Sequence, residues 1–181
     1  MRKRILTYQV AFAILGCIFF KPVQIRAQSL NYQLASVFVY NFIQSVEWPK
    51  DKRSGSFVIG VYGSSPLTAE LVKFITSKHV GDQPIIVKVI TSLDNAADCH
   101  VIFVPLDQSD KIKQICLQLK GKPILIIAEK IGLCKKGASI SLFLDEDDDY
   151  KTKFELNRAI IESNGLSISE RLILLASQMN K

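Results

Sequence analysis

Residues that commonly carry catalysis are scarce in this 181-residue chain, which has only two histidines. No two cysteines have CxxC spacing, so neither a zinc knuckle nor a thioredoxin-like redox site is predicted. Gly60 and Gly63 lack the third glycine and the Lys-Ser/Thr pair of a phosphate-binding loop. No serine lies in a nucleophile elbow, and no paired carboxylates face each other on adjacent predicted elements. The sequence therefore favours binding over catalysis, and we predict no enzyme activity, metal or cofactor.

The two histidines do not change this interpretation. His79 ends a predicted helix, where a solvated imidazole beside the helix C-terminus is expected. His100 lies at the start of a predicted buried strand, where a hydrogen-bonded structural histidine is favoured over a metal ligand or general base.

An acidic run near the C-terminal third resembles part of a calcium-binding loop. Asp145, Asp147 and Asp149 match the first three alternating ligands. However, Tyr150 stands where that loop needs glycine, and Leu156 stands where it needs a bidentate glutamate. We interpret the run as a solvated hairpin turn that discourages pairing between sheet edges.

The first 27 residues have the pattern of a secretory signal peptide. A cationic start at Arg2–Arg4 precedes an apolar stretch from Ile5 to Phe20, and the segment ends at the small residue Ala27. The alternative is a retained membrane anchor, but the stretch is shorter than the roughly 20 apolar residues that a spanning helix needs. We predict residues 1–27 as a cleaved signal and residues 28–181 as one domain that is periplasmic, secreted across the inner membrane.

Cleavage would remove most of the positive charge. The chain has 23 Lys and Arg against 17 Asp and Glu, a net charge of +6, but five of the basic residues and none of the acids precede Leu30. The remaining segment is therefore nearly neutral, with 18 basic against 17 acidic residues. No stripe of Lys and Arg with interleaved aromatics remains, so no nucleic-acid partner is predicted.

Three cysteines follow the predicted cleavage site: Cys99, Cys116 and Cys134. In an oxidising compartment they allow one disulfide and one free thiol. A strand starting at Cys99 and a helix returning through Cys116 would place these two residues at the same height along the strand direction. Cys134 lies beyond the next strand, at the opposite end. We prefer a Cys99–Cys116 bridge, which would contribute about 3 kcal/mol by loop entropy. The alternative is three buried free thiols.

Hydrophobic periodicity predicts an α/β fold with a mostly parallel central sheet covered by helices on both faces. A helix is expected over residues 31–48, ended by Pro49. Near-continuous Val/Ile runs then alternate with helical segments, giving strands at 56–63, 84–90, 100–104 and 123–128 and helices at 66–75 and 108–119. Alternating patterns at 138–144 and 150–156 predict a C-terminal antiparallel hairpin on the sheet, followed by helices at 158–163 and from 169.

Several short motifs in this order resemble one family. They are Tyr40-Asn41-Phe42 with Val46-Glu47-Trp48-Pro49, Cys99-His100-Val101-Ile102-Phe103-Val104, Phe154-Glu155-Leu156-Asn157, and Gly165-Leu166-Ser167-Ile168-Ser169 with Leu172, Leu174, Leu175 and Ala176. Together they are similar to the YfiR-like group of small periplasmic regulatory proteins, over nearly the whole of residues 30–176.

The resemblance implies an exported regulator that binds and represses the extracytoplasmic domain of an inner-membrane signalling protein. That partner would be a diguanylate cyclase, linking the chain to cyclic-di-GMP signalling, or a sensor kinase. It also implies an outer-membrane lipoprotein as a second partner, and a homodimer. The family's two-disulfide framework is not implied here, because three cysteines follow the predicted signal.

Two groups of residues are candidates for contacting a protein partner. Tyr40 and Trp48 belong to an aromatic set on the first predicted helix, and such side chains are favoured at interfaces. The alternative is that the whole aromatic set lies in the core. Lys135 and Lys136 form a basic loop, for which a simple solvated turn is the alternative.

A small-ligand receptor is the second function considered. Open parallel sheets bind ligands outside the carboxyl ends of their strands. Tyr62 lies at the end of the first predicted strand and Ser64 follows it, near Pro105 after the third strand. Tyr62 and Ser64 are the predicted ligand-binding residues. An exported hydrolase of unrecognised type is a third alternative.

Overall fold

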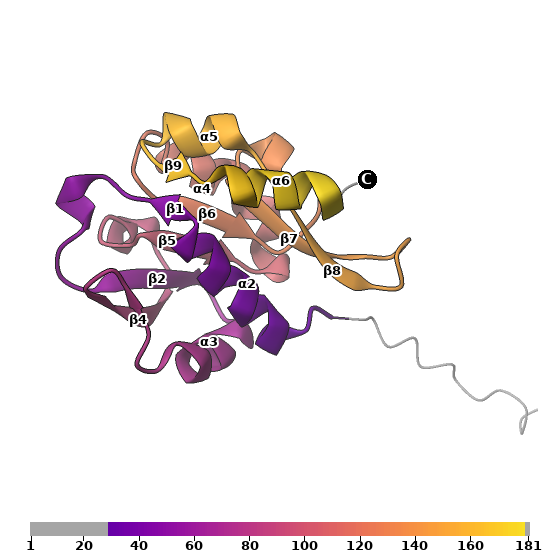
Figure 1. Cartoon of the computed structure of the whole chain (residues 1–181), viewed down its shortest axis with the longest axis horizontal. Coiled ribbons are helices and arrows are strands. Elements are labelled where there is room, and N and C mark those ends of the chain that lie inside the picture. Colours follow the sequence, from indigo (N-terminus) through magenta and orange to yellow (C-terminus); the bar gives the residue numbers. More distant parts are fainter. Residues whose placement is uncertain (1–28, 180–181) are drawn as a thin grey trace, which may run out of the picture.

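The computed structural model describes residues 29–179, with side chains as far as Ala176. The predicted signal peptide lies outside the described residues. The fold is α/β, as predicted, with a seven-stranded sheet and a separate two-stranded sheet (Figure 1). The strands are β1 (Val46–Glu47), β2 (Phe57–Tyr62), β3 (His79–Val80), β4 (Gln83–Ile90), β5 (Val101–Val104), β6 (Leu125–Ala128), β7 (Ile140–Asp145), β8 (Lys151–Leu156) and β9 (Ser167–Ile168). The helices are α2 (Tyr32–Gln44), α3 (Leu67–Ile75), α4 (Ile112–Gln118), α5 (Arg158–Ser163) and α6 (Glu170–Met179). Short 3₁₀ turns are η1 (Lys50–Lys52), η2 (Leu93–Ala96), η3 (Leu106–Lys111) and η4 (Leu133–Lys136).

The large sheet has the strand order β3-β4-β2-β5-β6-β7-β8. Its five central strands run parallel, and β3 and β8 pair antiparallel at the two edges. The mostly parallel sheet and the C-terminal hairpin of β7 and β8 are therefore confirmed. The chain places β4 on one side of β2 and then adds β5, β6, β7 and β8 on the other side. The direction in which strands are added thus reverses between β2 and β5, which is the switch point where doubly wound folds place their ligand sites.

Side chains alternate between the two faces of the sheet and form two separate cores. Strand residues such as Phe57, Val101 and Phe103 pack beneath α2, α3 and α6. Their neighbours Val58 and Ile102 pack on the opposite face, beneath α4 and η2. In Figure 1, α2 and α6 lie in front of the sheet and α4 lies behind it. Because both faces are covered there, the parallel strands β2, β5 and β6 are almost completely buried, whereas half of the residues of β4 are exposed.

Helix α2 begins with a side-chain cap. The side-chain oxygen of Asn31 accepts hydrogen bonds from the backbone N–H groups of Gln33 and Leu34, at 3.1 and 3.2 Å. Asparagine is favoured at this position because its side chain satisfies N–H groups that the helix leaves unpaired. The buried positions then recur at helical spacing: Ala35, Ser36, Val39, Phe42 and Ile43.

The prediction that the first helix continues to residue 48 is wrong. Helix α2 ends at Gln44, and the chain then becomes extended. Val46 and Glu47 form β1, which pairs antiparallel with β9 near the C-terminus. The backbone N–H of Ser169 donates to the carbonyl of Ser45 at 3.0 Å and continues this pairing. The small sheet therefore joins the two ends of the described chain.

Two further elements differ from the prediction. The helix expected at 108–119 is divided into the 3₁₀ turn η3 and the shorter helix α4. The edge strand β3, which pairs His79 with Pro84 and Val80 with Gln83, was not predicted. Both are short, and short elements carry little periodicity.

Candidate functional site

None of the helices within residues 29–179 is long and apolar enough to cross a membrane. In the same part of the chain, no three His, Cys, Asp or Glu side chains are grouped so that they could hold a metal ion. The candidate sites are therefore surfaces, cavities and buried polar groups.

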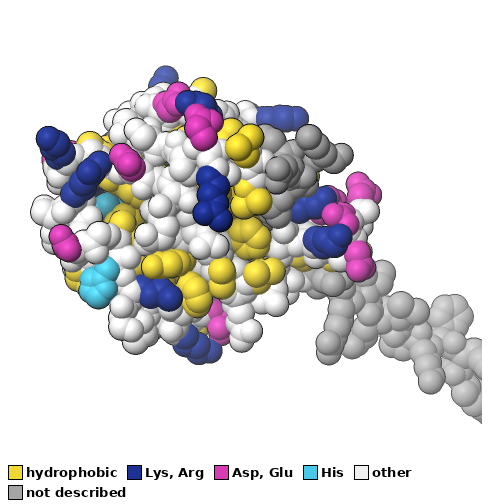
Figure 2. Space-filling view, viewed as in Figure 1, with side chains coloured by type: hydrophobic (Ala, Val, Ile, Leu, Met, Phe, Trp, Pro, Cys, Tyr) yellow, Lys and Arg dark blue, Asp and Glu magenta, His cyan; other side chains and the backbone are white. Residues whose placement is uncertain are grey.

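The helices α2 and α6 carry exposed apolar side chains. Figure 2 shows hydrophobic side chains gathered in the middle of the viewed face, over these two helices. The largest exposed fractions on them are at Leu174 (61%), Leu175 (44%) and Leu34 (42%). We call these three residues the apolar face. Val72 on α3 is also exposed, but it lines a separate cavity beside β4. Exposed apolar side chains that gather on one surface, rather than singly, are typical of interaction sites.

The two aromatic residues predicted to contact a partner lie in different surroundings. Tyr40 is half-buried, packs edge-on against Phe74 at 5.9 Å between ring centroids, and has the Lys78 ammonium 5.0 Å from its ring. Trp48 is only 4% exposed, packs edge-on against Phe57 at 4.9 Å, and donates its ring N–H to the carbonyl of His100. Trp48 thus lies in the core, and the partner surface proposed below does not include it.

The other predicted partner residues, Lys135 and Lys136, are exposed in η4. This turn lies between β6 and β7, over the α4 side of the sheet. It is held by glycines with left-handed backbone conformation on both sides, Gly132 (φ 78°) and Gly137 (φ 111°). The two lysines are therefore far from the apolar face in the fold, and nothing in the structure joins the two regions into one surface.

All three described cysteines have free thiols. Cys99 packs against Gly60 on β2, and Cys116 packs against Gly137, just before β7. Because β2 and β7 are three steps apart in the sheet and neighbouring strands are about 4.8 Å apart, these two thiols lie against different parts of the same face. The Cys99–Cys116 bridge is not formed in this structure and stays a prediction.

The thiols have little thiolate character. Burial raises the pKa of Cys116 to about 11 and that of Cys134 to about 12, and it also raises the pKa of Cys99. Since the thiolate is the nucleophile and metal ligand, none of the three has the environment of a reactive cysteine.

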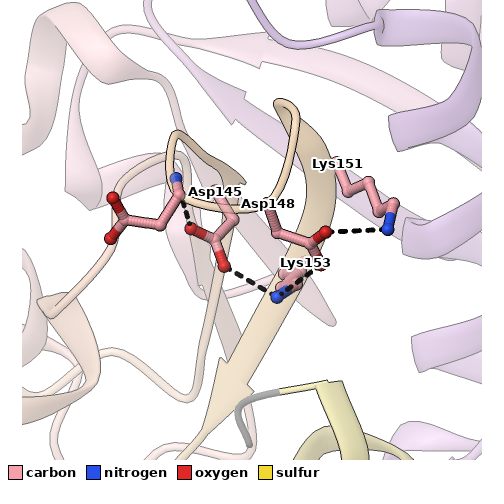
Figure 3. Close-up of polar contacts among 5 residues, drawn as sticks. Asp145, Asp148, Lys151 and Lys153 are labelled. Atoms are coloured by element: carbon pink, nitrogen blue, oxygen red, sulfur yellow. Dashed lines mark hydrogen bonds and ion pairs between the residues drawn. The ribbon is translucent and has the colours of Figure 1, made fainter.

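The acidic hairpin tip is held by ion pairs within the hairpin itself (Figure 3). The Lys153 ammonium lies between Asp145 and Asp148, at 2.7 and 2.9 Å, and Lys151 contacts Asp148 at 2.7 Å. Hydrogen bonds from these lysines lower the pKa of Asp145 and Asp148. Asp145 also accepts the backbone N–H of Asp147. Of the three carboxylates that match calcium ligands, Asp145 is thus already paired with a lysine.

His100 is a structural residue in this fold, as expected from its position. Its ring is buried and stacks on Phe57 at 4.4 Å between centroids. Nδ1 accepts the backbone N–H of Val58 at 3.1 Å, and Nε2 faces the carbonyl of Lys52 at 2.8 Å. A carbonyl can only accept, so Nε2 carries the proton and the ring is neutral. Burial lowers the pKa of His100, in agreement with this arrangement.

A cavity of about 380 Å³ lies at the carboxyl ends of β2 and β5, at the switch point of the sheet. The predicted ligand residue Ser64 lines it, together with Pro66 and Pro105. Tyr62 does not line this cavity. It faces the α4 side, where its ring lies 5.7 Å from the Lys111 ammonium and borders a smaller cavity of about 200 Å³. The two predicted ligand residues therefore lie at one edge of the sheet but on different sides of it.

A buried carboxylate at the end of β6 forms the polar part of the larger cavity. Glu129 is 6% exposed and accepts hydrogen bonds from the Tyr32 hydroxyl at 2.8 Å and the Leu106 backbone N–H at 3.4 Å. Burial raises the pKa of Glu129, while these two hydrogen bonds lower it. Burial and the neighbouring carboxylate also raise the pKa of Tyr32. Neither residue was a sequence-based candidate.

The chain has an α/β fold in which helices cover both sheet faces and leave apolar side chains exposed. The sequence profile of the YfiR/HmsC-like family matches residues 32–177. The chain therefore belongs to this family, whose members are periplasmic regulators of signalling proteins. A comparison with curated proteins finds no match.

Proposed function

We propose that this protein is a non-enzymatic periplasmic regulator that binds the extracytoplasmic domain of an inner-membrane diguanylate cyclase or sensor kinase and represses it. Membership of the YfiR/HmsC-like family is the observation that carries the proposal. An outer-membrane lipoprotein that releases the repression, and a homodimeric form of the regulator, belong to the same proposal.

The apolar face supports the proposal by offering a contact surface. Its residues come from α2 and α6, two helices that pack on the sheet, so no helix has to form on binding. Leu174 and Leu175 on α6 are exposed by 61% and 44%, while Leu172 and Ala176 of the same helix are buried. One side of α6 thus anchors the helix and the other offers leucines to a partner. Leucines that lose water on binding contribute through the hydrophobic effect.

A photo-crosslinking amino acid at position 174 tests the surface in the source cell. We expect an adduct with an inner-membrane protein whose extracytoplasmic domain precedes a cyclase or kinase domain. The same amino acid at position 117 is the matched control, because Leu117 is 74% exposed but lies on α4, on the opposite side of the sheet. Equal adducts from both positions would contradict the assignment of the surface.

Binding and repression are then measured on the identified partner. Leu174→Asp should weaken binding to the purified extracytoplasmic domain at least about tenfold, equivalent to about 1.4 kcal/mol, whereas Leu117→Asp should not. Deletion of the gene should raise the signalling output of the partner. An unchanged or lower output after deletion would show that the protein does not repress, whatever it binds.

A further inference from the structure

The carboxylate of Glu129 lacks a positively charged partner in the described part of the chain, although it is buried. Its two hydrogen bonds come from neutral donors, the Tyr32 hydroxyl and the Leu106 backbone. An ionised carboxylate offers about four acceptor positions, so about half of its capacity stays unused. Burying such a group without a paired charge is unfavourable, and a cation beside it would remove most of that penalty.

The walls of the cavity favour a cation over an anion. Asp107 and Glu129 are the two charged residues that line it, and none of the described lining residues is basic. The start of α3 also faces this edge, but it offers few donors to an anion. Ser65 already accepts the Leu67 N–H through its hydroxyl and the Thr68 N–H through its carbonyl, at 3.2 and 3.1 Å.

The cavity has the size and the lining of an organic-ligand site. Its volume of about 380 Å³ lies within the range of about 300–1,000 Å³ for small-molecule pockets. Pro66, Pro105 and Leu106 supply apolar walls. With two carboxylates and no third described His, Cys, Asp or Glu in the group, the residues are too few for a metal centre. The cavity also lies at the switch point between β2 and β5, where this topology opens the sheet to ligands.

We propose that this cavity binds a small organic cation that carries a protonated amine, with the ammonium against Glu129 and the carbon chain between Pro66 and Pro105. Tyr32 holds the carboxylate toward the cavity, and Asp107 adds negative potential at the opening. The site is independent of the proposed function, because it lies at the edge of the sheet and not on the apolar face.

Three four-carbon probes of equal length distinguish the chemistry: 1,4-diaminobutane, 1,4-butanediol and succinate. They are titrated at constant ionic strength, and binding is followed by amide NMR shifts at Leu106 and Glu129. Diaminobutane should give saturable shifts there, and the neutral diol and the dianion should give none. Saturable shifts with succinate, or diaminobutane shifts spread over the acidic hairpin instead of the cavity, would overturn the proposal.

Glu129→Gln keeps the shape of the side chain and removes its charge. It should weaken diaminobutane binding at least about tenfold, and Asp107→Asn should weaken it less. Glu47→Gln is the matched control, because Glu47 is an exposed carboxylate in β1, outside this cavity, and should leave the affinity unchanged. Tyr32→Phe removes only the hydroxyl donor and tests the site if Glu129→Gln fails to fold. Equal affinities in all four variants and the wild type would overturn the proposal.

Discussion

The two faces of the central sheet are built from different side chains. The face beneath α2, α3 and α6 holds the buried aromatics Phe42, Trp48, Phe57, Phe103 and Phe154. The core cluster beneath α4 holds mainly isoleucine, leucine, valine, alanine and cysteine, with Tyr62 as the aromatic packed at its edge. The two cores therefore differ in the size of their side chains.

The elements that cover the two faces differ as well. On the aromatic face, α2 and α6 leave the side chains of the apolar face exposed. On the aliphatic face, α4 is only seven residues long and the remaining connections are short 3₁₀ turns. On this face a Cβ added at Gly60 would crowd the Cys99 sulfur. Substitutions on the two faces should therefore have different consequences.

Removal of a buried aromatic ring should have the largest effect on the free energy of unfolding. Phe42 is fully buried, and its ring lies 4.9 Å from that of Phe154 and 5.9 Å from that of Phe38. We expect Phe42→Ala to lower the free energy of unfolding by about 3–5 kcal/mol through lost burial and a cavity. Urea denaturation measures the effect, with the exposed Leu117→Ala on α4 as control. A loss below about 1.5 kcal/mol would show that the aromatic core can collapse around the gap.

Addition of one carbon on the aliphatic face should have the next largest effect. A Cβ on Gly60 would lie 2.9 Å from the Cys99 sulfur and 3.2 Å from the Ile90 Cδ1. Gly60→Ala should therefore destabilise by about 1–3 kcal/mol through overpacking.

The contact with Cys99 can be isolated by a double-mutant cycle. In the Gly60→Ala/Cys99→Ala variant the sulfur is absent, so the double variant should be more stable than the two single changes predict, by at least about 0.5 kcal/mol. Additive changes would mean that Cys99 is not the group that crowds position 60.

The sequence predicted the parallel strands well, because each is a continuous Val/Ile run that two covered faces require. The error at the end of α2 has a physical cause. Val46 and Trp48 are apolar at a spacing of two, which a strand needs, but they directly follow a strong helical pattern. The strand partner of Val46 is Ile168, more than 100 residues later, and local periodicity carries no information about a pairing of that range.

The cavity was predicted only in part for a similar reason. Ser64 was found because it follows a strand at the ligand-binding edge of the sheet. Glu129 follows β6 at the same edge, and an acid directly after a buried strand was a usable signal. Its partner Tyr32 is 97 positions away, so the sequence alone could not show that the carboxylate is buried and bonded rather than solvated.

The pH dependence of folding should depend on His100, which lies against the aromatic core. Burial lowers its pKa in the folded state. Below about pH 6.5 the imidazole binds a proton in the unfolded state but stays neutral in the folded state. The free energy of unfolding therefore decreases as the pH falls. Above that pH both states are neutral and the contribution is constant.

Urea denaturation at about pH 7.5 and about pH 5.5, on either side of the ordinary histidine pKa, measures this loss. The loss in the wild type should exceed that in His100→Gln, which cannot titrate. His79→Gln, at an exposed position in β3, should behave as the wild type. Equal losses in all three proteins would assign the pH dependence to other groups.

The smallest effect on stability should come from the exposed leucines that distinguish the two faces on the surface. Leu174→Ser on α6 and Leu117→Ser on α4 remove side chains that are 61% and 74% exposed. Both should change the free energy of unfolding by no more than about 0.5 kcal/mol, as surface substitutions usually do. Only Leu174→Ser should weaken binding to the extracytoplasmic domain of the partner, measured by calorimetry. If instead Leu117→Ser alone weakens it, the partner binds the aliphatic side of the sheet, and the functional surface lies on the face with the smaller side chains.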